Sequence, residues 1–167
     1  MKRNLQVVLF LAILVVSAQT AYSCSCFRID NEAEVKITDF IFVGKVVEIV
    51  EDKTYIPPKV EGVSEFYQKM IDTRKRYLIK FKIEKKFKGV ESDEITLVKY
   101  EQENSMCAGL SFEMEKTYLI YADKNEESEE INDNGLCSRT QNFDKTSKDY
   151  KELLNLKNKK RIEQKKS

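Results

Sequence analysis

Four cysteines constrain the fold of this chain more than any other feature, because two stand almost together near the start and two stand far along the sequence. They are Cys24, Cys26, Cys107 and Cys137. An even number of cysteines in an exported protein predicts disulfides, and four cysteines allow three pairings. A bond between Cys24 and Cys26 would close a strained ring around one residue. Two pairings stay open, Cys24–Cys107 with Cys26–Cys137 or the swapped set, and either attaches the beginning of the mature chain to two distant points.

The first 23 residues have the pattern of an export signal. Lys2 and Arg3 give a positive start, and an apolar run of ten residues follows from Val7 to Val16. That run is too short to cross a bilayer, which takes roughly 20 residues. Small residues at the third and first positions before Cys24 fit signal peptidase cleavage there. We therefore expect a mature chain that is secreted and extracellular, without a transmembrane span, or periplasmic or in the cell envelope if the source is bacterial.

Three alternatives concern this beginning of the chain. The apolar run would stay attached if it were an uncleaved anchor. Cys24 would carry a lipid if the chain were a bacterial lipoprotein, although the bulky Tyr22 before it fits that signal poorly. The four cysteines would alternatively form a zinc site, but they lack paired Cys-x-x-Cys spacing. The export pattern favours disulfides over a zinc site.

The composition excludes several classes of functional site. The chain has no histidine, which excludes imidazole-based catalytic triads and metal sites with histidine ligands. Without the two basic residues of the signal, 27 Lys and Arg stand against 28 Asp and Glu, so net charge gives no argument for nucleic acid as a partner. A hydrolase with paired carboxylates stays open, but no motif supports it. We expect a monomer that is not an enzyme and holds no cofactor of its own.

The spacing of apolar residues predicts a protein of mainly β structure. Residues 40–50 are rich in aromatic and β-branched side chains, and Gly44 among them indicates a bulge or bend. Residues 76–87 alternate between apolar and mostly basic side chains, as a half-buried strand does. Five short strands hide their edges best by closing, which favours a five-stranded, OB-fold-like antiparallel barrel. The remaining strands are expected at 94–100, 117–122 and, as a short fifth strand, 135–140.

Helices and loops fill the rest of the chain. A short N-terminal helix is expected at 30–38, and a C-terminal helix is expected from about Ser147 to Lys159, where it frays into a Lys-rich tail. The C-terminal helix would dock through Tyr150, Leu153, Leu154 and Leu156. Residues 51–75 read as a long loop with a short helix near 64–71, and the acidic residues 123–134 read as a solvated loop. The expected organisation is a signal at 1–23, a barrel domain at 24–143, and a helix and tail at 144–167.

The strand order combined with the cysteine spacing resembles a known family. The segments that carry the likeness are Cys-Ser-Cys at 24–26, Thr-Asp-Phe-Ile-Phe-Val-Gly-Lys-Val-Val at 38–47, Glu-Asn-Ser-Met-Cys-Ala-Gly at 103–109, Thr-Tyr-Leu-Ile-Tyr-Ala at 117–122 and Leu-Cys at 136–137. Together they resemble the N-terminal inhibitory domain of the tissue inhibitors of metalloproteinases, or TIMPs. The likeness covers roughly residues 24–140, and the loop at 51–75 does not align.

The resemblance implies a fold, a disulfide pairing and a mechanism. The family's inhibitory domain is an OB-fold barrel, and the implied bonds are Cys24–Cys107 and Cys26–Cys137. In the implied mechanism, the free backbone amine and the carbonyl of Cys24 chelate the catalytic zinc of a target metalloproteinase. Ser25 would enter the pocket beside the zinc, and Phe27 would flank the contact. The zinc would belong to the protease alone.

Three departures from the family bear on activity. The chain lacks the third cysteine pair of the inhibitory domain, it has a Lys-rich helix in place of a cysteine-rich C-terminal domain, and its loop at 51–75 is its own. A barrel that keeps these disulfides for stability alone, with binding elsewhere on its faces or loops, is therefore the competing interpretation.

Overall fold

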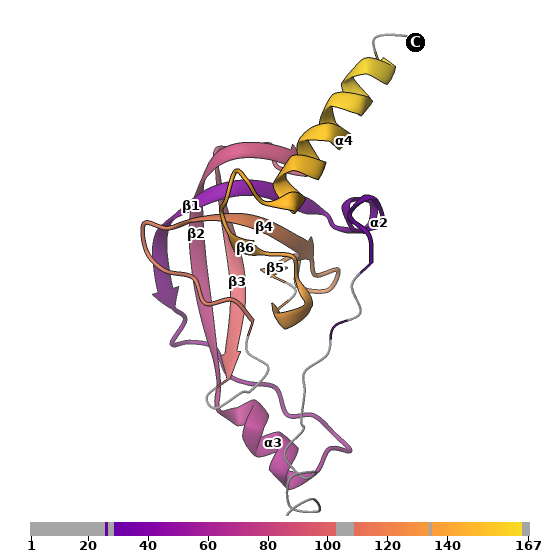
Figure 1. Ribbon diagram of the computed structural model, residues 1–167. Helices are drawn as coiled ribbons and strands as arrows, with labels where there is room; N and C mark the ends of the chain where they lie inside the picture. The colour runs from indigo at the N-terminus through magenta and orange to yellow at the C-terminus, as the bar shows by residue number, and fades with distance from the viewer. Residues whose placement is uncertain (1–25, 27–28, 103–108, 134, 165–167) are drawn as a thin grey trace, which may run out of the picture.

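A closed β-barrel forms the centre of the protein in the computed structural model, which describes residues 26, 29–102, 109–133 and 135–164. Helix α4 (Lys148–Gln164) lies against the outside of the barrel at one end, and helix α3 (Glu65–Asp72) lies at the opposite end (Figure 1). Within the described chain, no helix is both long and apolar enough to cross a membrane.

The barrel closes through a continuous circuit of strand pairings. β1 pairs with β2 on one side and with β4 on the other, β2 pairs with β3, and β5 lies between β3 and β4. The short β6 (Gln141–Asn142) pairs with β4 outside this circuit. The predicted fold of mainly β structure around an OB-fold-like barrel is confirmed. The strands are β1 (Phe40–Glu51), β2 (Arg74–Lys88), β3 (Glu94–Gln102), β4 (Thr117–Lys124) and β5 (Ile131–Asp133).

Two details of the predicted barrel are wrong. The pairing of β3 with β5 is parallel, so the barrel is mixed rather than wholly antiparallel. The fifth strand is Ile131–Asp133, inside the segment expected to be a loop, and not 135–140. Gly135 has φ +61°, in the left-handed region that favours glycine, and it begins a 3₁₀ turn, η2 (Gly135–Cys137). Ile131 packs against the barrel core, which favours this short segment as the closing strand.

β1 contributes side chains to two apolar clusters, one inside the barrel and one between the barrel and α4. Phe42 and Val46 of β1 point into the barrel, where rings and aliphatic side chains of β2, β3 and β4 surround them. Ile41 and Val43 point outward and pack under Tyr150 and other apolar residues of α4. Because β1 is buried on both faces, its sequence is a continuous apolar run rather than a clean alternation. Tyr150 and Leu153 of α4 are buried, as the sequence predicts.

Gly44 lies where the register between β1 and β2 shifts, which confirms the predicted irregularity in β1. A Cβ atom at this position would lie 3.0 Å from the Phe42 ring and 3.2 Å from Cβ of Phe81. The glycine therefore lets the two strands approach closely at the bulge.

The helices begin close to the predicted positions. Helix α2 (Asn31–Ile37) follows Asp30, whose carboxylate accepts a hydrogen bond from the Ala33 amide at 3.0 Å. That bond is the main cause of a lowered pKa for Asp30. Helix α3 is capped in the same way by Ser64. Helix α4 continues to Gln164 instead of fraying after Lys159, because Lys, Arg, Glu and Gln are good helix formers.

Candidate functional site

Two segments that are far apart in the chain meet at the end of the barrel beside α2 (Asn31–Ile37). We call this region, which contains Cys26 and η2, the N-terminal edge. Cys26 lies ahead of α2, and Cys137 ends η2 directly after β5. The two cysteines form a disulfide with Cα atoms 5.3 Å apart and a sequence separation of 111. This is one of the two pairings that the family resemblance implies. Among the other predicted site residues, Cys24 with its implied partner Cys107, Ser25 and Phe27 lie outside the described residues.

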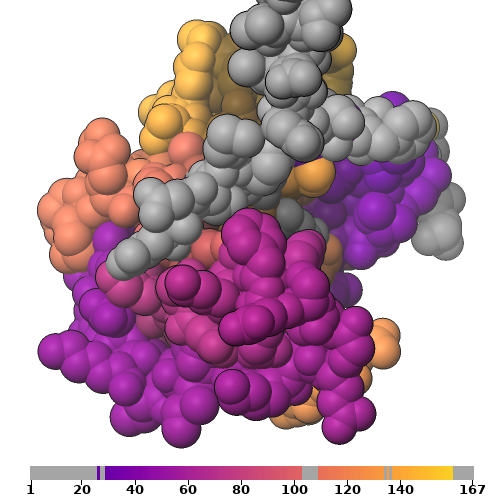
Figure 2. Space-filling view, turned by 90° about the horizontal axis from the view of Figure 1, so that it is seen from below, coloured from indigo at the N-terminus to yellow at the C-terminus, as the bar shows by residue number. Residues whose placement is uncertain are grey.

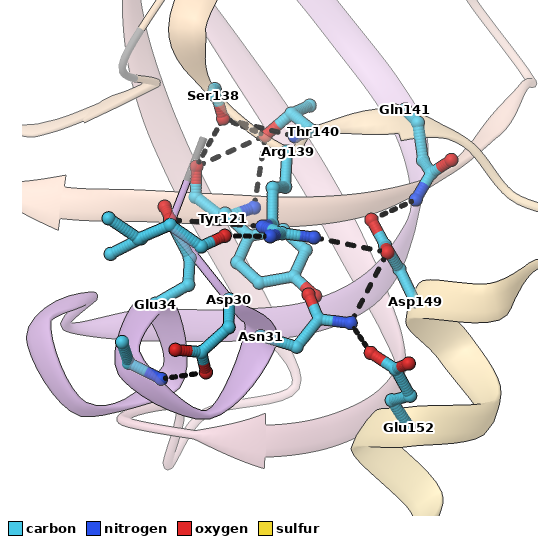
Figure 3. Close-up of polar contacts among 12 residues, drawn as sticks. Asp30, Asn31, Glu34, Tyr121, Ser138, Arg139, Thr140, Gln141, Asp149 and Glu152 are labelled. Carbon is cyan, nitrogen blue, oxygen red and sulfur yellow. Dashed lines mark hydrogen bonds and ion pairs between the residues drawn. The ribbon is translucent and has the colours of Figure 1, made fainter. Parts of the chain in front are cut away.

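Arg139 makes a second connection at this edge, two residues after the bridged Cys137. Its guanidinium donates hydrogen bonds to the backbone carbonyl of Ile29 and, at 3.2 Å, to Asp149 Oδ1 in α4. Its Nε atom lies 3.8 Å from Glu34 Oε2 in α2, an ion-pair distance. The side chain is only 12% exposed. Arg139 thus ties the N-terminal segment, α2 and α4 to the chain that follows the disulfide (Figure 3).

Asp149 collects the remaining contacts of this cluster. Besides Arg139, it accepts hydrogen bonds from Gln141 Nε2 at 3.1 Å and from Asn31 Nδ2 at 3.3 Å. The same Asn31 amide group also donates to Glu152 in α4. Figure 3 shows these side chains converging between α2 and α4. We call Asn31, Glu34, Arg139, Asp149 and Glu152 the anchor cluster.

Tyr121 of β4 lies beneath the anchor cluster and is 1% exposed. No hydrogen-bond partner for its hydroxyl occurs among the described residues. Burial, and then the nearby negative charge of Asp149, raise the pKa of this phenol above its ordinary value of 10.0. The hydroxyls of Ser138 and Thr140 each donate a hydrogen bond to the backbone carbonyl of Tyr121 at 3.1 Å. These bonds attach the segment after the disulfide to β4 as well.

The contacts of the anchor cluster indicate a structural role, which is to hold the N-terminal segment in place. It contains one guanidinium and three carboxylates. Arg139 pairs with Glu34 and Asp149, and the Asn31 amide donates to Asp149 and Glu152. Within the described part of the chain, no group of three or more Cys, Asp or Glu residues is placed to hold a metal ion. The cluster therefore fixes the backbone at Ile29 and Asn31, three and five residues after the disulfide at Cys26.

Sequence reasoning missed the anchor cluster because its members lie up to 121 residues apart and carry no motif. One signal was available. The chain contains 23 lysines but only six arginines, so an arginine two residues after a bridged cysteine is a departure from the usual basic residue. A planar guanidinium can bridge several acceptors, which a lysine ammonium does less well.

No protein-family model matches this chain, and no curated protein sequence matches it.

Proposed function

We propose that the protein is a secreted, TIMP-like inhibitor of a zinc metalloproteinase, with the backbone amine and carbonyl of Cys24 as its zinc-binding atoms. The observation that carries the proposal is the double attachment of the N-terminal segment to the barrel. The disulfide holds Cys26, and Arg139 holds Ile29 three residues later. Cys24 precedes Cys26 by two residues, so the covalent chain keeps their Cα atoms within about 7 Å of each other.

Fixing this segment favours inhibition for a thermodynamic reason. A catalytic zinc keeps one coordination position open for water or substrate. An amine and a carbonyl of one residue can close a five-membered chelate ring at that position. A chain that is already ordered loses less entropy when it binds, so more of the zinc interaction appears as affinity. The amine must be unprotonated, and its ordinary pKa of about 7.7–8.0 makes this inexpensive near neutral pH.

The fold is also compatible with a second candidate function. An OB-fold-like barrel hosts many unrelated functions, so the barrel alone is equally compatible with a binding module whose disulfides serve only stability. The two interpretations differ in what the N-terminus does. Inhibition requires a free amine on Cys24, whereas a binding module does not.

The test compares two forms of the mature protein, one beginning at Cys24 and one carrying a single alanine before it. Both are assayed against a panel of secreted zinc endopeptidases with a fluorogenic peptide substrate. Thermal unfolding of both forms provides the folding control. We expect the natural form to inhibit at least one protease and the extended form to lose at least a hundredfold in affinity, because an added residue removes the amine from the chelating position.

A third form with Ser25→Arg separates the pocket contact from chelation, since it keeps the amine and changes only the neighbouring side chain. We expect weaker inhibition that differs between proteases. Equal inhibition by the natural and the alanine-extended forms contradicts the chelation mechanism, and no inhibition by either form across the panel contradicts the inhibitory function.

A further inference from the structure

A second cluster at the opposite end of the barrel surrounds an open cleft of about 490 Å³. The cleft lies between the chain that follows β1 and the loop between β4 and β5. Figure 2 views the molecule from this end, where the residues between β1 and β2 cover much of the surface in purple and magenta. The volume of the cleft falls in the usual range for ligand sites, about 300–1,000 Å³.

The floor of the cleft is a fixed ion-pair network around Arg76. The guanidinium bridges Asp52 and Glu130, and all three side chains are at most 25% exposed. Asp52 also accepts hydrogen bonds from the hydroxyl and the amide of Thr54, at 2.6 Å and 3.0 Å. The Arg76 charge is therefore already engaged by two carboxylates, which leaves no strong attraction for an anionic ligand.

Two tyrosines form the wall of the cleft. The rings of Tyr55 and Tyr100 pack with their centroids 5.4 Å apart, and Tyr100 is 40% exposed. The Tyr100 hydroxyl donates to Glu130 Oε2 at 3.2 Å, which holds the ring over the ion-pair network. Exposed aromatic faces attract cations through the ring quadrupole and pack against aliphatic chains.

The rim adds negative charge that the network does not neutralise. Glu127 lines the cleft, and among the described residues no side-chain partner of its carboxylate is found. The Asn125 side chain accepts hydrogen bonds from the amides of Glu127 and Ser128, at 2.9 Å and 3.0 Å, and so fixes the loop that carries Glu127. Three carboxylates and one guanidinium line the cleft in total, and its field favours a cation.

We propose that this cleft binds a basic side chain, arginine or lysine, presented by a peptide segment of a partner protein. The aliphatic stem of the ligand packs on the tyrosine wall, and its charged end reaches Glu127 and Glu130 Oε2. This is a recognition site distinct from the N-terminal edge, and it does not depend on the zinc-binding role of Cys24. The aromatic wall and the ion-paired floor distinguish it from an acidic surface loop.

The test uses two blocked amino acids that differ in charge but not in shape. N-acetylarginine amide and N-acetylcitrulline amide are titrated into the mature ¹⁵N-labelled protein, and backbone amide shifts are followed by NMR. We expect saturable shifts at residues 52–56, 100 and 125–130 with the arginine compound, weakening as salt is added. The uncharged citrulline compound should give no saturable shifts there.

Variants then test the assigned contacts. We expect Glu127→Gln and Tyr100→Leu each to weaken binding about two- to fivefold, as the loss of one partly exposed charge or ring predicts. Glu129→Gln is the matched control, because Glu129 lies in the same loop but pairs with Lys124 at 3.2 Å. Glu127 is exposed, so its variant remains folded even if the tyrosine variant does not.

Several results overturn the proposal. These are equal binding of the citrulline compound, equal weakening by the Glu129 control, and no saturable shifts at the cleft with the arginine compound. Stronger shifts at the same residues with a neutral disaccharide or with inorganic phosphate also contradict it, because they assign the cleft to a sugar or an anion.

Discussion

Each end of the barrel contains an arginine that pairs with two carboxylates, but the two arginines have different surroundings. Arg139 lies at the N-terminal edge beside a disulfide, and its contacts join segments 110 residues apart. Arg76 lies at the opposite end, joins two neighbouring loops and underlies an open cleft. The comparison indicates that one network fixes backbone for a rigid edge, whereas the other fixes side chains around a surface that a ligand can reach.

The largest expected effect comes from the Cys26–Cys137 disulfide at the N-terminal edge. Replacing Cys26 and Cys137 together by serine should lower the free energy of unfolding by about 2–5 kcal/mol, because the bridge restricts the unfolded chain over a long loop. Urea unfolding of the variant and the parent measures this loss. A loss below about 1 kcal/mol would mean that the anchor cluster alone holds the N-terminal segment.

The second-largest expected effect is the difference in stability loss between variants of the two arginines. Arg139→Met removes the partner of a backbone carbonyl and two carboxylates at a 12% exposed position, and we expect a loss of about 2–4 kcal/mol in unfolding free energy. Arg76→Met, at an 18% exposed position, should lose less, about 1–2 kcal/mol. Urea unfolding of both variants tests the ranking, and Arg139→Lys should recover only part of the loss. A larger loss at Arg76 would reverse the assignment of the structural network.

The smallest expected effect lies at Tyr121, beneath the anchor cluster. Its buried hydroxyl lacks a hydrogen-bond partner among the described residues, so Tyr121→Phe should change stability by less than about 1 kcal/mol at neutral pH. The raised pKa of this phenol gives the pH dependence. Above pH 10 the unfolded chain loses the proton while the folded chain keeps it, so stability falls as pH rises.

The phenylalanine variant should therefore resist alkaline unfolding better than the parent. Equilibrium unfolding from pH 8 to pH 11.5 measures this difference, with Tyr67→Phe as the control because Tyr67 is 59% exposed. If the two variants behave alike, burial does not control the ionisation of Tyr121.

Much of the barrel could be predicted from sequence because long strands carry a readable pattern. β1, β2, β3 and β4 contain runs of apolar or alternating residues, and all four lie where the pattern places them. β5 could not be found in this way, since it has three residues and a single apolar side chain, Ile131, within an acidic stretch. Its parallel pairing with β3 depends on barrel closure, which is a property of the whole sheet.

The candidate sites were predictable only in part. Cysteine spacing points to the N-terminal edge, because a bridged Cys-x-Cys leaves few geometries for the chain around it. The partners of Arg139 and Arg76 lie in loops and helices whose distances in space follow from the fold and not from local sequence. The Tyr55–Tyr100 wall is equally hidden, since its two rings come from segments 45 residues apart.

The most direct test of the central claim is the intact mass and N-terminal sequence of the protein as its own cell exports it. We predict a chain that begins at Cys24 with an unmodified amine and a mass four hydrogens below that of the reduced form, as two disulfides require. A lipid on that cysteine, or uncut residues before it, would contradict a zinc-binding N-terminus.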